Sequence, residues 1–106
     1  MIYNLEKDLE RQAVKHVESL GGICLKVALA YGRGYPDREI ILPDGLTVRT
    51  EFKRKDGRLS KHQRSWITKL RELGHHATVV DDLEDFKRDI LIAQCAHSLK
   101  ERLDNA

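Results

Sequence analysis

The pattern of apolar residues in this 106-residue chain predicts an α/β fold, in which a mixed β-sheet is flanked by helices. Three observations lead to this prediction. Apolar residues recur every three or four positions in three segments, residues 5–20, 60–73 and 82–103, as they do in amphipathic helices. Short apolar runs of strand length lie between these segments. A Pro-Asp-Gly turn joins two of the runs into a hairpin, so the predicted order is α-β-β-β-α-β-α.

The first predicted helix, residues 5–20, carries its apolar stripe on one face and ends at Gly21-Gly22. The apolar run at residues 23–29 follows directly and predicts a short strand. Residues 30–36, which are rich in glycine and tyrosine, predict a loop.

The hairpin register follows from its turn. Pro43-Asp44-Gly45 fits a three-residue loop, because proline suits the first turn position and glycine adopts the left-handed conformation that follows. In this register Asp37 lies opposite Glu51. One face is then apolar and the other charged, whereas a slip of one residue would mix the two faces.

The second half of the chain predicts a βαβ crossover followed by a long helix. Ser60 and Gln63 match the S-x-x-Q capping box at the start of helix 60–73. The run at residues 76–80 predicts a strand parallel to the third one. In the last helix, residues 82–103, apolar positions continue to Leu99 and Leu103, further than the core of a small domain requires. We therefore expect this helix to contribute to a dimer.

Length and composition favour a single globular domain over residues 1–106. Charged residues make up 34% of the chain and hydrophobic residues 41%, which is not the composition of a disordered protein. The net charge of +2 does not by itself indicate nucleic-acid binding, although basic residues gather between residues 49 and 64. No apolar run approaches the roughly 20 residues that span a membrane. Cys24 and Cys95 lack metal-site spacing, and we expect both to be reduced and buried in a cytoplasmic protein.

Two acids and a lysine gather at the end of the hairpin away from its turn. Asp37 and Glu51 would have β-carbons about 5 Å apart, so their charges repel unless a cation neutralises them. Mg²⁺ takes one or two protein carboxylates and leaves positions for water and substrate oxygens, which suits hydrolysis of a phosphate ester. Lys53 points to the same side as Glu51 and can hold an attacking water or a phosphate oxygen. A solvated face with cross-strand ion pairs is the alternative, and Glu39 with Arg49 fits that description; spacing alone leaves both interpretations open.

The motifs resemble a nuclease family. Pro36-Asp37 followed by Glu51-Phe52-Lys53 is similar to the pattern of the PD-(D/E)XK nucleases. The longer string GYPDREIILPDG, then TEFKRKDGRLSKHQ, resembles the VRR-NUC branch in its small stand-alone phage and bacterial form. The resemblance covers roughly residues 5–85 and implies a restriction-endonuclease-like fold. In family members the middle residue of the second motif is often smaller than Phe52. The side chain of Phe52 falls on the apolar face of the predicted hairpin.

The resemblance also implies roles for individual residues. Asp37 and Glu51 match the metal-binding acids, and the main-chain carbonyl of Phe52 is expected to be a further ligand for Mg²⁺ or Mn²⁺. Lys53 matches the catalytic lysine and Gln63 the glutamine near the scissile phosphate. Glu10 is the better match to the acid of the first helix, with Glu6 as the reserve. The two are four residues apart on one helix face, so their spacing does not separate them.

Several residues around this site are candidates for DNA contact. In the loop, Arg33 can pair with a phosphate, and Tyr31 or Tyr35 can stack on a base. A basic track of exposed side chains can contact the backbone without regard to sequence, and its members are Arg54, Lys55, Arg58 and Lys61. A flexible turn and a solvated basic loop are the respective alternatives.

The family resemblance implies a metal-dependent, structure-specific DNA endonuclease. The expected activity is that of a Holliday-junction resolvase, acting as a homodimer on branched DNA. A flap or end-processing nuclease is one alternative. A non-catalytic DNA-binding module on the same fold is another, although such a module would have no need for Asp37, Glu51 and Lys53.

Overall fold

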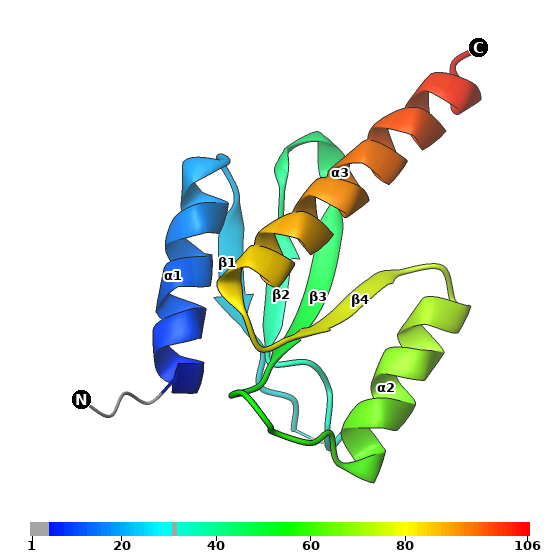
Figure 1. The fold of residues 1–106 in the computed structure, drawn as a ribbon. Coiled ribbons are helices and arrows are strands. Elements are labelled where there is room, and N and C mark those ends of the chain that lie inside the picture. The colour runs from blue at the N-terminus through cyan, green and yellow to red at the C-terminus, as the bar shows by residue number, and fades with distance from the viewer. Residues whose placement is uncertain (1–4, 31) are drawn as a thin grey trace.

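The computed structural model describes residues 5–30 and 32–106 and confirms the predicted order of elements (Figure 1). The chain forms α1 (Leu5–Ser19), β1 (Ile23–Lys26), β2 (Arg38–Ile41), the 3-10 turn η1 (Pro43–Gly45), β3 (Thr47–Phe52), α2 (Lys61–Glu72), β4 (His76–Val80) and α3 (Leu83–Asp104). Within the described residues, no helix is long and apolar enough to cross a membrane.

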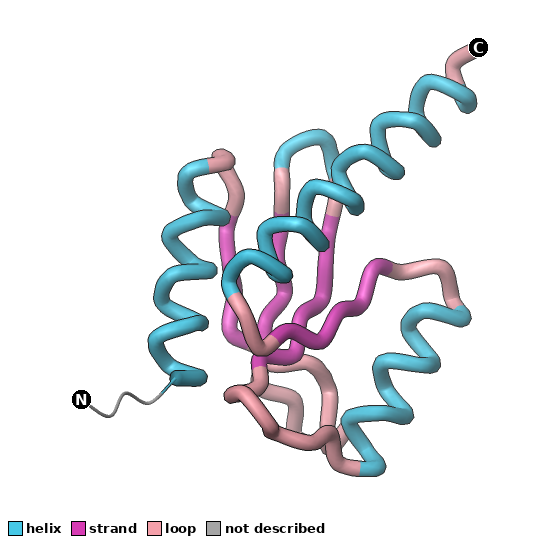
Figure 2. Tube along the Cα trace, in the orientation of Figure 1, coloured by secondary structure: helices cyan, strands magenta, loops and turns pink. Residues whose placement is uncertain are grey.

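The four strands form one mixed sheet in the order β1-β2-β3-β4 (Figure 2). The β1–β2 and β2–β3 pairs are antiparallel, and β3 pairs with β4 in parallel. Helix α2 makes the crossover between β3 and β4, as the sequence predicts.

The hairpin register is the predicted one. Ile40 pairs with Val48 and Glu39 with Arg49, and the N–H of Leu42 donates to the carbonyl of Leu46 at 2.8 Å. Asp44 (φ 68°) and Gly45 (φ 79°) both adopt the left-handed conformation in the turn. In this register β2, which begins directly after Asp37, lies beside β3, which contains Glu51.

The main core lies between one face of the sheet and the helices α1 and α3, which cover it (Figure 1). Phe52 and Phe86 meet at its centre with ring centroids 5.5 Å apart. The apolar hairpin face is buried here, together with the apolar stripes of both helices. The hydrophobic residues of this core with no exposed surface are Ala13, Val17, Ile40, Val48, Phe52 and Phe86.

Helix α2 packs on the opposite face of the sheet, against β4. Its cluster joins Ile67 and Leu70 to Ala77, and Tyr35, Trp66 and Val79 pack around them. On the β1–β2 half of this face, Ile23, Leu25 and Ile41 remain exposed.

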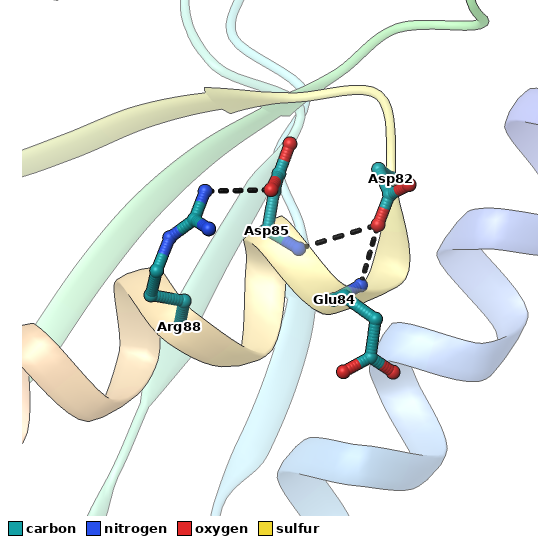
Figure 3. A network of polar contacts seen from close by, with 4 residues as sticks. All are labelled: Asp82, Glu84, Asp85 and Arg88. Carbon is teal, nitrogen blue, oxygen red and sulfur yellow. Dashed lines mark hydrogen bonds and ion pairs between the residues drawn. The ribbon is translucent and has the colours of Figure 1, made fainter.

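Asp82 caps the start of α3. Its Oδ1 accepts from the N–H groups of Glu84 (2.7 Å) and Asp85 (3.3 Å), and Arg88 pairs with Asp85 one turn later (Figure 3). This cap ends the turn from β4 and directs the helix across the sheet.

The second half of α3 projects beyond the sheet, because its buried residues end at Ala93 (Figure 1). Leu99 and Leu103 are exposed there. Cys95 is exposed as well, so the prediction that both cysteines are buried is wrong for Cys95, while Cys24 is half-buried. Strand β1 is also shorter than predicted and ends at Lys26.

Candidate active site

The two acids of the hairpin meet where β2 begins and β3 ends. Glu51 is only 5% exposed, with its side chain on the α2 face of the sheet. Asp37 comes directly before β2 and is half-buried. The Oδ1 atom of Asp37 is buried and has no hydrogen-bond partner among the residues that the structure describes. A buried acceptor of this kind is costly unless it has a ligand.

The environment of Glu51 favours its protonated form when no cation is bound. Burial, then the hydrogen bond and the negative charge of Asp37, raise the pKa of Glu51 to about 8. Lys53 opposes this shift, whereas the charge of Glu6 adds to it. The two carboxyl groups therefore lack a compensating positive charge, and a bound cation would stabilise their ionised forms.

Lys53 follows Glu51 by two residues and is half-buried beside it. Its main-chain N–H donates to the carbonyl of Val80 at 2.9 Å, which holds this end of β3 against β4. The positive charge of its ammonium group lowers the pKa of Glu51 and so partly offsets the effect of burial.

Gln63 joins α2 to the acid pair. Its Oε1 accepts from the N–H of Ser60 at 2.8 Å, and its own N–H donates to Ser60 Oγ at 3.1 Å, which completes the predicted capping box. Its Nε2 donates to Glu51 Oε2 at 3.3 Å. The helix cap therefore sets the orientation of the glutamine that contacts Glu51.

The loop before Asp37 is held against the start of α2. Trp66 Nε1 donates to the carbonyl of Arg33 at 3.1 Å. Gly34 (φ 88°) packs so closely that an added β-carbon would lie 2.6 Å from the main-chain carbon of His62. The loop that leads into Asp37 and the helix that carries Gln63 thus form one packed unit.

Comparison with known proteins agrees with this geometry. The chain matches no protein-family model. It is 33% identical over 76 residues to the "Putative nuclease p44" of Acyrthosiphon pisum secondary endosymbiont phage 1, covering 72% of this chain and 82% of that protein. A solved structure described as a "VRR_NUC domain" superposes with a TM-score of 0.77 at 26% identity, covering 83% of this chain and 96% of the other. The chain belongs to the VRR-NUC family.

The donor set of this VRR-NUC site fits a divalent cation. Asp37 provides an unpartnered buried oxygen and Glu51 a second carboxylate beside it. Among residues 5–30 and 32–106, no third His, Cys, Asp or Glu side chain completes a cluster of three. Two carboxylates suit an ion such as Mg²⁺ that keeps several waters.

The structure separates the two candidate acids of α1. Glu10 Oε1 accepts from Arg38 Nε at 3.0 Å, in an ion pair whose side chains are 15% and 17% exposed respectively. Glu6, one turn earlier, is half-buried, and its charge reaches Glu51. The sequence ranks Glu10 first, whereas the ion pair of Glu10 with Arg38 and the charge of Glu6 near Glu51 favour Glu6 as the candidate acid of α1.

The candidate DNA contacts divide into exposed and packed groups. The basic track is exposed along the loop from β3 to α2 and onto the first residue of that helix; it comprises Arg54, Lys55, Arg58 and Lys61. Arg33 is exposed as well. Tyr31 lies outside the described residues.

Tyr35, for which the sequence predicts base stacking, is half-buried and makes two contacts within the protein. Its ring meets Trp66 edge-on, with centroids 5.0 Å apart, and its hydroxyl accepts from Arg49 Nε at 3.0 Å. Arg49 also pairs with Glu39 at 3.5 Å, as predicted. Sequence reasoning missed the contact of Tyr35 and Trp66 because they lie 31 positions apart on different elements. The only local signal for it was an aromatic residue in an otherwise polar stretch of α2.

Proposed function

We propose that this protein is a divalent-metal-dependent DNA endonuclease and that it resolves Holliday junctions as a homodimer. One observation carries the proposal: the buried Glu51 carboxyl lies against Asp37, Gln63 donates to it, and the charge of Lys53 acts on it. A solvated ion-pair surface does not account for a buried pair of like charges. The phage relative is named as a nuclease, which supports the same activity.

Asp37, Glu51 and the main-chain carbonyl of Phe52 would hold the cation, Mg²⁺ or Mn²⁺, and Glu6 would act on it from α1. We propose Glu6 in place of Glu10, because Glu10 is engaged by Arg38. The bound ion would supply positive charge to the acid pair and to the phosphate as negative charge builds there.

Two further side chains, those of Lys53 and Gln63, have roles in the proposed reaction. Lys53 holds a water or a phosphate oxygen with its ammonium group, close to the point where the phosphodiester is attacked. Gln63 fixes the Glu51 carboxylate by donating to Oε2. Because the other end of Gln63 is held by Ser60, this donor is oriented before substrate binds.

Exposed basic side chains on both sides of the site would contact the DNA. Arg33 lies on the loop before Asp37, and the basic track lies after Lys53. Contacts of this kind attach to phosphates and give affinity without sequence information. Recognition of DNA structure fits this surface, and a two-fold dimer would cut two strands of a four-way junction.

The test is cleavage of end-labelled four-way junction, flap and linear duplex DNA in Mg²⁺, Mn²⁺ or EDTA. Wild-type protein is compared with Glu51→Gln and Lys53→Ala, and Glu10→Gln is the matched control. We expect paired, near-symmetric cuts on the junction that disappear in EDTA and in the first two variants.

Cuts on flaps or ends alone would retain the active site and contradict the resolvase assignment. If DNA binds and no substrate is cut with either metal, the protein is a non-catalytic DNA-binding module, and the nuclease proposal fails.

A further inference from the structure

Arg49 of β3 contacts the two residues that flank Asp37 at equal distances along the chain. Its Nε donates to the hydroxyl of Tyr35 at 3.0 Å, and its Nη2 lies 3.5 Å from Oε1 of Glu39. Tyr35 precedes Asp37 by two residues and Glu39 follows it by two. One guanidinium group therefore holds the chain on both sides of a proposed metal ligand.

Asp37 lies at the edge of the hairpin ladder, so side-chain contacts contribute to its position. The ladder between β2 and β3 ends at Arg38 and Thr50, and Asp37 comes just before this last pair. On the β1 side, the carbonyl of Asp37 accepts from the N–H of Val27 at 2.9 Å. On the β3 side, the side chain of Arg49 reaches past the end of the ladder to the segment before Asp37.

Tyr35 is in turn held against α2. Its ring meets Trp66 edge-on, with ring centroids 5.0 Å apart. Arg49 and Glu51 are two residues apart on β3, so their side chains point to the same face of the sheet, the face on which α2 packs. Through Tyr35, Arg49 thus connects the strand that carries Glu51 to the loop that leads into Asp37.

The chemistry of this contact requires arginine. The two nitrogens that Arg49 uses belong to one planar group, so a hydroxyl and a carboxylate are held in a fixed relation to each other. Lysine would keep the positive charge without this planar fork. A cross-strand ion pair that served only the hairpin would need Glu39 alone, whereas the second contact, with the Tyr35 hydroxyl, reaches the loop before the metal ligand.

We propose that Arg49 is a positioning residue for the metal site. By holding Tyr35 and Glu39, it fixes the placement of the Asp37 carboxylate that would meet the divalent cation. This inference rests on the proposed function, in which Asp37 binds that cation. Positioning from outside is needed because Asp37 Oδ1 has no hydrogen-bond partner among the described residues. Loss of such an outer contact typically weakens metal affinity or activity by about 10–100-fold.

The test is the affinity of the protein for Mn²⁺ without DNA, measured from the electron paramagnetic resonance signal of free Mn²⁺. Wild type is compared with Arg49→Lys and with Tyr35→Phe, which lacks only the hydroxyl and retains the ring that packs on Trp66. We expect the Kd for Mn²⁺ to rise about tenfold or more in both variants. In single-turnover cleavage both should need more Mn²⁺ than wild type and approach the wild-type rate once Mn²⁺ is saturating.

Two control variants lie on α3, which covers the opposite face of the sheet. Arg88→Lys changes another ion-paired arginine, whose partner is Asp85. Ile90→Val lowers the melting temperature by removing a buried methyl group. Neither should change the Kd for Mn²⁺. The double variant Tyr35→Phe/Arg49→Lys should bind Mn²⁺ no more weakly than Arg49→Lys alone, because both substitutions remove the same contact.

Equal Mn²⁺ affinity in wild type and in folded Arg49→Lys and Tyr35→Phe proteins would overturn the proposal. So would an equal loss of affinity in either control, or a cleavage rate that stays low in saturating Mn²⁺. A wild type that binds Mn²⁺ and cuts no DNA would end the nuclease proposal, while the affinities would still decide the role of Arg49. A wild type that binds no Mn²⁺ would overturn both.

Discussion

Gln63 Nε2 lies 3.3 Å from Glu51 Oε2 while the other end of the same amide closes the cap of α2 on Ser60. A single side chain therefore stabilises a helix start and contacts the buried acid of the candidate active site. The two roles depend on different atoms of the amide, so substitutions can separate them.

Gln63→Glu should keep the cap and impair cleavage. Glutamate serves the capping box as well as glutamine does, but it offers Glu51 a negative charge in place of a donor. A hydrogen bond to a charged group contributes about 1.5–3 kcal/mol, so we expect cleavage to fall by roughly tenfold or more. Single-turnover cleavage and thermal melting measure the two effects.

The matched variant is Ser60→Ala. Loss of the cap should cost about 0.5–2 kcal/mol of stability, with cleavage by the folded protein largely retained. If Gln63→Glu loses stability and keeps its cleavage rate, the contact with Glu51 has no role in the reaction.

The metal-free protein should become less stable as pH rises from about 4.5 to about 8. The pKa of Glu51 is about 8 in the folded protein against 4.5 as its ordinary value. Between these values the folded protein retains a proton that the unfolded chain has released, so the free energy of unfolding falls with rising pH. Denaturant melts in EDTA across this range measure the effect.

Glu51→Gln is the control for this pH dependence, because an amide cannot titrate. The variant should lose the part of the slope that comes from Glu51. An identical slope in wild type and variant would mean that Glu51 is ionised throughout this range.

Substitutions at the two acids of α1 should have opposite effects on cleavage and on stability. Glu6→Gln should reduce cleavage sharply at little cost in stability, because Glu6 acts on the acid pair. Glu10→Gln should retain cleavage and lose about 1–3 kcal/mol of stability, because a neutral amide replaces the carboxylate that pairs with the partly buried Arg38 at 3.0 Å. Cleavage and urea unfolding of both variants decide the assignment, and the reverse pattern would restore Glu10 as the helix acid.

Gly34→Ala should disturb the site more than Gly45→Ala. Both glycines have positive φ, 88° and 79°, so the backbone strain of the substitution is similar. Only at Gly34 would the new methyl group meet main-chain atoms of α2, at 2.6 Å, whereas nothing lies within 4 Å at Gly45. We expect Gly34→Ala to cost about 1–3 kcal/mol more than Gly45→Ala, and to slow cleavage by shifting the loop before Asp37. Equal melting temperatures for the two variants would show that this close contact is not required.

Local chemistry determined the helices, the strands and the hairpin register. The Pro-Asp-Gly turn sets the offset between β2 and β3, and the Ser60–Gln63 pair marks the start of α2 within the sequence itself. Because that offset places Asp37 opposite Glu51, their approach was predictable from the sequence before any tertiary contact was known.

Only the tertiary structure decided which partners those residues meet. Glu6 and Glu10 lie on one face of α1, and the packing of that helix on the sheet assigns Arg38 to Glu10 and leaves Glu6 near Glu51. Likewise, Tyr35 meets Trp66, and α2 covers only half of its sheet face. Helical and strand periodicity specify the direction of a side chain relative to its own element. Burial, pKa and the exposed patch depend on how elements distant in sequence pack together, and periodicity carries no information about that.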